Sequence, residues 1–311
     1  MSDYIAERRK KIKEDINALD RIIDSNTRIF VINNRRKELY DILYKHHYNE
    51  KDLVDRRFLA IGPGSFRHKY WRTADKTYGE EKLSWMQRRG VEFIGKPDYH
   101  WDIMDGIPLN EEDNYFNVIY SSHVIEHFFD SDVLFMFKEV YRLLKPGGVF
   151  RVICPDIRLF AESYINKDWG FFLDYLYSKT GRISSNMLLL EELYSDGFFA
   201  KFLLSFVSLL ANDRNDVFLS NAECKEFIES EKDMFYIFDK ASELSSRELN
   251  KEIGAHVNWF DKNKLMYFLK RSGFKDVKEK SYLKSNCAIL RDPNFFDKTD
   301  PEMSIFFEAY K

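Results

Sequence analysis

The stretch from Arg57 to Asp75 brings a glycine-rich turn and a carboxylate close together in the sequence. Phe58 to Ile61 form a short apolar run that predicts a buried strand, and this run stops at Gly62-Pro63-Gly64. Glycine has no Cβ, so the backbone can turn tightly there and approach a ligand closely. Asp75, at the end of a second predicted strand, can accept hydrogen bonds from the two hydroxyls of a ribose. An ordinary strand, turn and strand is the alternative, and this stretch alone does not decide between the two.

Polar side chains follow later strands at comparable positions. Tyr115 to Tyr120 and Val149 to Cys154 read as strongly apolar strands, and Asp156 and Arg158 come directly after the second of them. Open α/β sheets bind ligands at the carboxyl edge of their strands, so we expect Asp156, Arg158 and the more distant His256 to meet at that edge. Arg158 can pair with a phosphate or carboxylate of a substrate, and a surface salt bridge is the alternative.

The elements that must position these residues alternate between strand and helix, which predicts a parallel, doubly wound sheet. The clearest helix covers residues 131–144, with apolar side chains along one face. Lys145-Pro146-Gly147-Gly148 follows, with the basic last turn, proline and glycine expected beyond a helix C-terminus. Shorter elements are expected at residues 82–89, as a helix, and at 91–94, as a strand.

The pattern changes to helices and loops dense in Phe, Tyr and Leu from about Ile157 to Ala255. Strand alternation then resumes, with a helix over residues 262–272, a strand near 277–283 and a final strand at 304–310. We expect the apolar residues of the middle stretch to form the private core of a helical cap; a pocket for an apolar acceptor or a lipid-linked glycan is the alternative. The predicted organisation is an N-terminal helical arm at 1–56, a cofactor-binding half at 57–157, the cap at 158–255 and the completion of the sheet at 256–311.

The N-terminal arm contains two predicted amphipathic helices, at about residues 4–24 and 35–47. The first has apolar residues at alternating steps of four and three over only about two heptads, fewer than a coiled coil needs. We therefore expect this helix to pack on its own domain, and a homodimer interface formed by the helix is the alternative.

Composition excludes several classes of protein. A formal net charge of -3 gives no general attraction to nucleic acid or to an anionic membrane. The three cysteines are far apart and odd in number, which favours a reducing, cytoplasmic location and argues against a zinc site. No apolar signal segment begins the chain, and the longest apolar run, residues 198–211, is too short to span a bilayer.

The motifs together resemble the class I S-adenosylmethionine-dependent methyltransferases, and most closely the type 11-like enzymes of bacterial sugar and surface-polysaccharide pathways. The resemblance implies a Rossmann-like, seven-stranded, mostly parallel sheet with an antiparallel last strand and a helical cap inserted after the fifth strand. It rests on residues 61–64, Trp71, Asp75, residues 101–103, 116–128 and 144–156, and on the later segments 256–261, 271–274 and 304–311.

The resemblance also implies roles in binding S-adenosylmethionine. Gly62 and Gly64 would pass under the methionine part, Asp75 would bind the ribose, and Asp102 with the backbone of Ile103 would hold the adenine. The family's usual third small residue is absent from the turn, which leaves the path of this loop open. The expected cofactor-binding residues are Gly62, Pro63, Gly64, Arg67, Asp75, Asp102, Ile103, Ser121 and Ser122.

Methyl transfer is a displacement at a carbon already activated by the sulfonium, so the protein mainly positions the reactants and removes a proton from a hydroxyl acceptor. His123 is the first candidate for this general base, because histidine takes up protons near neutral pH; a histidine that only shapes the turn is the alternative. Asp156 and His256 complete the expected catalytic residues. The strand ends in Ser121-Ser122-His123 rather than a pair of carboxylates, so we expect metal-independent transfer.

The leading functional hypothesis is methyl transfer to a hydroxyl of a sugar, nucleotide-sugar or glycan. Transfer to an amine, such as an amino sugar or phosphoramidate, and a non-catalytic scaffold with a methyltransferase fold are the alternatives. A nucleic-acid substrate is the weakest option, since the Asn/Asp-Pro-Pro-aromatic signature and a basic stripe are both missing.

Overall fold

The computed structural model describes residues 7, 10, 11, 13, 14, 39–64, 66–76, 96–180, 195–212, 218–253 and 255–311. The elements predicted at residues 82–89 and 91–94, and most of the helix predicted at 4–24, lie outside these residues. Of the second arm helix, residues 39–47 are described, and they are helical as predicted.

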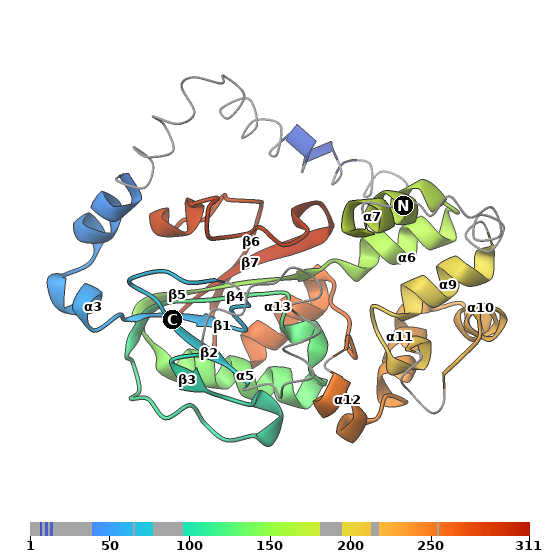
Figure 1. Ribbon diagram of the computed structural model, residues 1–311, viewed down its shortest axis with the longest axis horizontal. Coiled ribbons are helices and arrows are strands. Elements are labelled where there is room, and N and C mark those ends of the chain that lie inside the picture. Colours follow the sequence, from blue (N-terminus) through green and yellow to red (C-terminus); the bar gives the residue numbers. More distant parts are fainter. Residues whose placement is uncertain are drawn as a thin grey trace. The chain divides into compact units, whose positions relative to one another are not determined.

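A single seven-stranded sheet forms the centre of the fold, with strand order β3-β2-β1-β4-β5-β7-β6 (Figure 1). The pairs β1 with β2, β1 with β4, β2 with β3 and β4 with β5 are parallel, whereas β6 and β7 are antiparallel. The predicted Rossmann-like sheet is therefore confirmed. The strands are β1 (Phe58–Ile61), β2 (Arg72–Asp75), β3 (Tyr99–His100), β4 (Phe116–Ser122), β5 (Leu144–Pro155), β6 (Asp276–Lys280) and β7 (Ser304–Tyr310).

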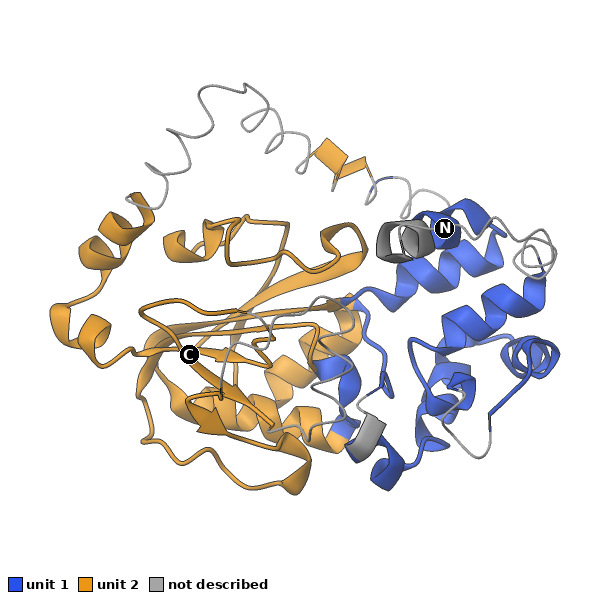
Figure 2. Cartoon of the chain, in the orientation of Figure 1, with its two compact units in different colours: residues 1–8, 125–130, 155–261 blue, residues 9–124, 131–154, 262–311 orange. Residues whose placement is uncertain are grey.

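The chain divides into two compact units, drawn in different colours in Figure 2. One unit contains the sheet, together with α3 (Glu50–Val54), α5 (Asp130–Leu143) and α13 (Lys262–Arg271). The other comprises residues 1–8, 125–130 and 155–261. Its described part is helical, as the sequence predicts, and contains α6 (Ile157–Ile165), α7 (Trp169–Thr180), α9 (Asp196–Leu204), α10 (Asn221–Glu229), α11 (Met234–Glu243) and α12 (Arg247–Ile253).

An aromatic layer covers the sheet beside the connection from β1 to β2. Parallel strands are usually joined through a helix, but the described residues between Ile61 and Arg72 form only turns and loop. Tyr44, from helix 39–47, packs edge-on against Phe58 and stacks on His68, with ring centroids 5.3 and 5.0 Å apart. A helix from the N-terminal arm therefore buries the apolar surface that a crossover helix would otherwise cover.

Lys145 to Gly148 follow the end of a helix, as predicted, but they also belong to a strand whose predicted start was Val149. α5 ends at Leu143, and β5 begins at the next residue and runs through these four positions. Gly147 has a φ of 77°, and its N–H donates to the carbonyl of Lys311 at 2.8 Å. The Lys311 N–H in turn donates to the Gly148 carbonyl. Lys311 thus supplies hydrogen bonds that continue the strand where the local sequence indicates a turn.

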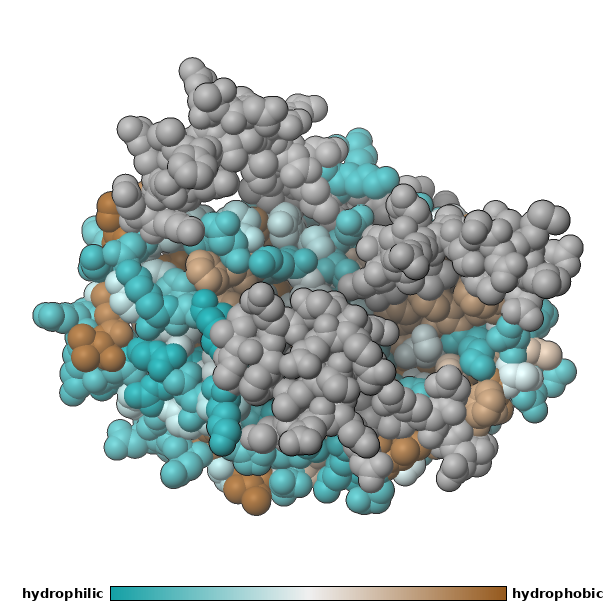
Figure 3. All heavy atoms as spheres, viewed as in Figure 1, coloured by the Kyte–Doolittle hydropathy of each residue, from teal (hydrophilic) through white to brown (hydrophobic). Residues whose placement is uncertain are grey.

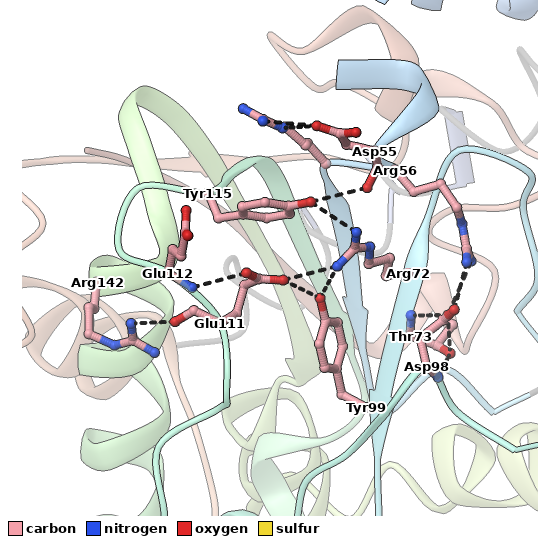
Figure 4. A network of polar contacts seen from close by, with 11 residues as sticks. Asp55, Arg56, Arg72, Thr73, Asp98, Tyr99, Glu111, Glu112, Tyr115 and Arg142 are labelled. Carbon is pink, nitrogen blue, oxygen red and sulfur yellow. Dashed lines mark hydrogen bonds and ion pairs between the residues drawn. The ribbon is translucent and has the colours of Figure 1, made fainter. Parts of the chain in front are cut away.

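A polar network fixes the amino ends of β2 and β3 (Figure 4). Arg72 donates to the Glu111 carboxylate at 2.9 Å and to the hydroxyl of Tyr115 at 2.9 Å, and Tyr99 also donates to Glu111. Beside it, Asp98 accepts from the backbone N–H of Thr73 at 2.8 Å. Since these contacts fix where β2 begins, they also fix where its carboxyl end falls.

A buried ionic group joins the middle of the sheet to the connection between β6 and β7. Arg151 on β5, Asp297 in that connection and Glu308 on β7 have side chains that are 0% exposed. Arg151 Nε donates to Asp297 at 2.9 Å and its Nη1 donates to Glu308 at 3.1 Å. Asp297 also accepts from the Leu283 N–H, and its own N–H donates to Tyr120 Oη on β4. Three strands and a loop are thus tied to one guanidinium.

The described residues that are visible in Figure 3 are mostly hydrophilic, with hydrophobic residues in several separate places. No helix in the described ranges is both long enough and apolar enough to cross a bilayer.

We predict that Asp297→Asn lowers the free energy of unfolding by about 3–5 kcal/mol, because it leaves a buried guanidinium without one of its charged partners. Urea unfolding followed by circular dichroism measures this change. Asp113→Asn is the matched control: Asp113 pairs with Arg142 at 2.7 Å, but its side chain is 67% exposed, so the cost should stay below about 1 kcal/mol. Equal losses in the two variants would contradict a central role for the buried group.

Stability should also depend on pH through His68. Burial first, and then the nearby charge of Lys69, lower the pKa of His68 from 6.5 to about 4. The backbone N–H of Tyr70 donates to its Nδ1, which fits a neutral ring. The unfolded chain therefore binds the proton more readily, and stability is complete above pH 6.5 and is lost as pH falls toward 4.

Between pH 7.5 and 5 this loss should amount to about 1–2 kcal/mol in the native protein. His68→Phe keeps an aromatic ring and has nothing to titrate, so its loss over the same interval should be smaller by that amount. Denaturant unfolding of both proteins at the two pH values gives the comparison, and identical pH dependence would refute the assignment.

Candidate cofactor site

The turn after β1 is shaped by close packing against Val124. Gly62 has a φ of 60°, and its N–H donates to the Ala74 carbonyl at 3.0 Å. A Cβ at Gly62 would lie 2.3 Å from Val124 Cγ2, whereas a Cβ at Gly64, φ 51°, would meet nothing within 4 Å. Gly62 is therefore needed for packing as well as for its backbone conformation, and Gly64 leaves open space beside the backbone.

The loop that follows Gly64 is held by an aromatic anchor. Phe66 lies among Trp71, Tyr120 and Phe296, with ring centroids 5.6 to 6.4 Å away. The Phe66 N–H donates to the carbonyl of Pro63 at 2.7 Å, which closes a tight turn. Arg67 Nη1 donates to the carbonyls of Gly64 and Phe66. These contacts define the path of the loop, which the sequence did not determine because the family's third small residue is absent.

Asp75 and Asp102 stand at the carboxyl ends of neighbouring strands. Asp75 pairs with His100 in the parallel register of β2 and β3, and its carbonyl accepts from the Trp101 N–H at 2.9 Å. Asp102 caps the short helix η1 (Ile103–Asp105) by accepting from the Met104 N–H. Its other carboxylate oxygen lies 2.9 Å from Lys76 Nζ. A carboxylate has about four acceptor positions, so these bonds leave capacity for a ligand donor.

Ser121 lies beside the glycine turn, because the register of β1 and β4 pairs it with Ile61. It is 1% exposed, and its buried Oγ has no hydrogen-bond partner in the described part of the chain. Leaving a buried hydroxyl unsatisfied costs about 1–3 kcal/mol. This hydroxyl and the open space at Gly64 fit a polar ligand at the turn. Ser122, the last residue of β4, is half-buried.

His123 is held in an uncommon backbone conformation directly after β4. Its φ is 55°, and its N–H donates to the Ile153 carbonyl at 2.9 Å. Nε2 lies 2.8 Å from Ser304 Oγ, and Ser304 Oγ donates to the Asp300 carbonyl at 2.7 Å. Because the Ser304 proton is used on Asp300, we assign the ring proton to Nε2, which leaves Nδ1 as the basic nitrogen. A strained, oriented histidine of this kind suits a functional role.

The other two expected catalytic residues, Asp156 and His256, belong to the helical unit that comprises residues 155–261. Asp156 is fully buried and caps α6 by accepting from the Arg158 N–H at 3.2 Å. Arg158 pairs with Asp261 at 3.0 Å and lies 3.8 Å from Glu162, both in its own unit. The salt bridge considered as its alternative role is therefore present. The ring of His256 lies against that of His127, with centroids 4.7 Å apart.

The structure adds Val124, Lys76 and Ser304 to the expected site. Val124 directly follows His123 and Lys76 directly follows Asp75, so the sequence places both beside expected site residues and could have indicated them. The sequence gives no indication that Ser304 belongs to the site, because its contact with His123 joins residues 181 positions apart.

Comparison with known proteins gives one family match: residues 62–152 match the model of a methyltransferase domain. No curated protein matches the chain. Among solved structures, an S-adenosylmethionine-dependent methyltransferase from Mesorhizobium loti is 13% identical and aligns over 82% of this chain and 90% of its own, with a TM-score of 0.36.

A "possible histamine N-methyltransferase" from Thermotoga maritima is 14% identical over 89% of this chain and 95% of its own, with a TM-score of 0.33. PigF with SAH is 10% identical over 86% of this chain and 53% of its own, with a TM-score of 0.36. Residues 62–152 thus form a methyltransferase domain built on the Rossmann-like sheet, and the cofactor of this enzyme is S-adenosylmethionine.

We predict that Asp75→Ala weakens binding of S-adenosylhomocysteine at least about tenfold, because it removes the carboxylate that we expect to accept two charge-assisted hydrogen bonds from the ribose. Isothermal titration calorimetry measures the affinity. Asp105→Ala, which removes an exposed carboxylate from the neighbouring loop, should bind as the native protein does. Unchanged affinity in Asp75→Ala would mean that the cofactor lies elsewhere.

Proposed function

We propose that the protein transfers the methyl group of S-adenosylmethionine to a hydroxyl of a sugar, nucleotide-sugar or glycan. The observation that carries this proposal is the orientation of His123, whose Nε2 is bonded to Ser304 Oγ. A hydroxyl acceptor must lose a proton as it attacks, and an oriented neutral imidazole is a suitable base. The bound cofactor supplies a methyl group already activated for displacement.

The cofactor would be held by the residues around the glycine turn. Gly62 and Gly64 let the backbone approach it, and the buried Ser121 hydroxyl offers a partner on its methionine side. Asp75 would accept from the ribose hydroxyls and Asp102 from the adenine amino group. The other members of the proposed site are Pro63, Arg67, Ile103 and Ser122.

The proton would leave the acceptor through His123 Nδ1. Nε2–H of the ring donates to Ser304, so a positive charge that forms on the imidazole is shared with the Ser304 hydroxyl and the Asp300 carbonyl. Because β4 ends in two serines and a histidine rather than a carboxylate pair, we propose that no metal ion contacts the acceptor. The carbohydrate acceptor is supported by the sequence resemblance to sugar-pathway enzymes.

We predict that His123→Ala lowers kcat about 10²- to 10⁴-fold and leaves the affinity for S-adenosylhomocysteine nearly unchanged, as expected for a general base. The acceptor would first be found by transfer of labelled methyl to a cell extract fractionated into nucleotide sugars, lipids and polysaccharide. Ser304→Ala should give a smaller loss in kcat, because the ring keeps its base nitrogen and loses only its orienting bond. Near-native activity in His123→Ala would instead favour a neutral amine acceptor.

A further inference from the structure

Three potential metal ligands lie together in the helical unit. Each of Glu126, His127 and His256 offers one ligand atom, and these atoms all lie within 4.8 Å of one another. The rings of His127 and His256 meet edge to face, with centroids 4.7 Å apart and planes inclined at 74°. Two imidazoles and a carboxylate are a recurrent ligand set for zinc and other divalent transition metals.

The backbone around these side chains is held in place by its own hydrogen bonds. The Glu126 carbonyl accepts from the N–H groups of Val257 at 2.9 Å and Asn258 at 3.1 Å. The Asn250 side chain donates to the His127 carbonyl at 2.9 Å. The ligands thus come from two segments far apart in the sequence whose main chains are fixed against each other, so the site is preorganised.

Burial strengthens the case for a cation. Glu126 is 2% exposed, and both of its carboxylate oxygens and Nδ1 of His127 are inaccessible to solvent. The ring of Phe206 lies 5.4 Å from that of His256 and forms an apolar wall on this side. A carboxylate in such surroundings is costly unless a positive charge lies beside it.

We propose that Glu126, His127 and His256 bind one divalent transition metal ion of the zinc class through one carboxylate oxygen and two imidazole nitrogens. The ion would be structural, joining residues 125–130 to residues 256–258 within the helical unit. His123 and Glu126-His127 have the H-x-x-E-H spacing of some zinc enzymes, but His123 is bonded to Ser304 and belongs to the other unit. The third ligand is therefore His256, and the proposal stands apart from the methyl-transfer mechanism.

The test uses the full-length protein, stripped with a chelator and titrated with Zn²⁺ and, separately, with Co²⁺. We expect about one equivalent of tightly bound metal and a higher midpoint of thermal unfolding in its presence. His256→Gln and Glu126→Gln should weaken binding at least about 10- to 100-fold, since even residues behind metal ligands contribute that much. The absorption of bound Co²⁺ should show a site of low coordination with nitrogen ligands.

The control variant replaces His46 and His47 by alanine together. Their rings also lie 5.0 Å apart, but both residues are exposed on helix 39–47, so metal binding should match that of the native protein. Binding equal in the native protein and in His256→Gln, or binding lost only in the His46/His47 variant, would overturn the proposal. Absence of stoichiometric metal would instead identify the cluster as a carboxylate and histidines that share a proton.

If a ligand variant fails to fold, as judged by circular dichroism and by binding of S-adenosylhomocysteine, the Co²⁺ spectrum of the native protein decides. A spectrum identical to that of the hydrated ion would refute the site.

Discussion

The buried guanidinium of Arg151 is the constraint on which the rest of the sheet depends. Its carboxylate partners stand in the loop before β7 and on β7 itself, so β7 can insert beside β5 only in the register that pairs all three charges. Removing either carboxylate would leave a charge buried without compensation. The same register sets the position of Ser304, the first residue of β7, which orients His123 at the carboxyl edge of β4.

The glycine turn depends on a second constraint, the aromatic layer beside β1 and β2. Tyr44 from the N-terminal arm packs on Phe58 and covers the surface that a crossover helix would cover. Phe66 packs on Phe296 and so anchors the loop that follows Gly64. The loop can therefore be short and still have a defined path. This explains how the glycine turn has a defined backbone although it lacks the third small residue that is usual in the family it resembles.

Much of the fold could be predicted because its signals are local. The apolar runs of β1 and β4, the amphipathic face of α5 and the glycine after α13 agree with the structure to within one or two residues. The helix ends before Lys145 as predicted, but the prediction missed that β5 already includes Lys145 to Gly148, where proline and glycines indicate a turn. There Lys311 donates and accepts backbone hydrogen bonds, and a partner so distant along the chain cannot be read from the local sequence.

The sequence by itself determined the class of the protein, since a glycine turn, spaced carboxylates and alternating elements act through neighbouring residues. Only the tertiary structure decided how the ring of His123 is oriented, because its partner Ser304 lies 181 positions away. It also decided that residues 125–130 join the helical unit and bring Glu126 and His127 to His256. The physical reason is the same in both cases. These side chains are positioned by contacts between segments that are distant in the sequence, and such contacts cannot be predicted from the spacing of the residues along the chain.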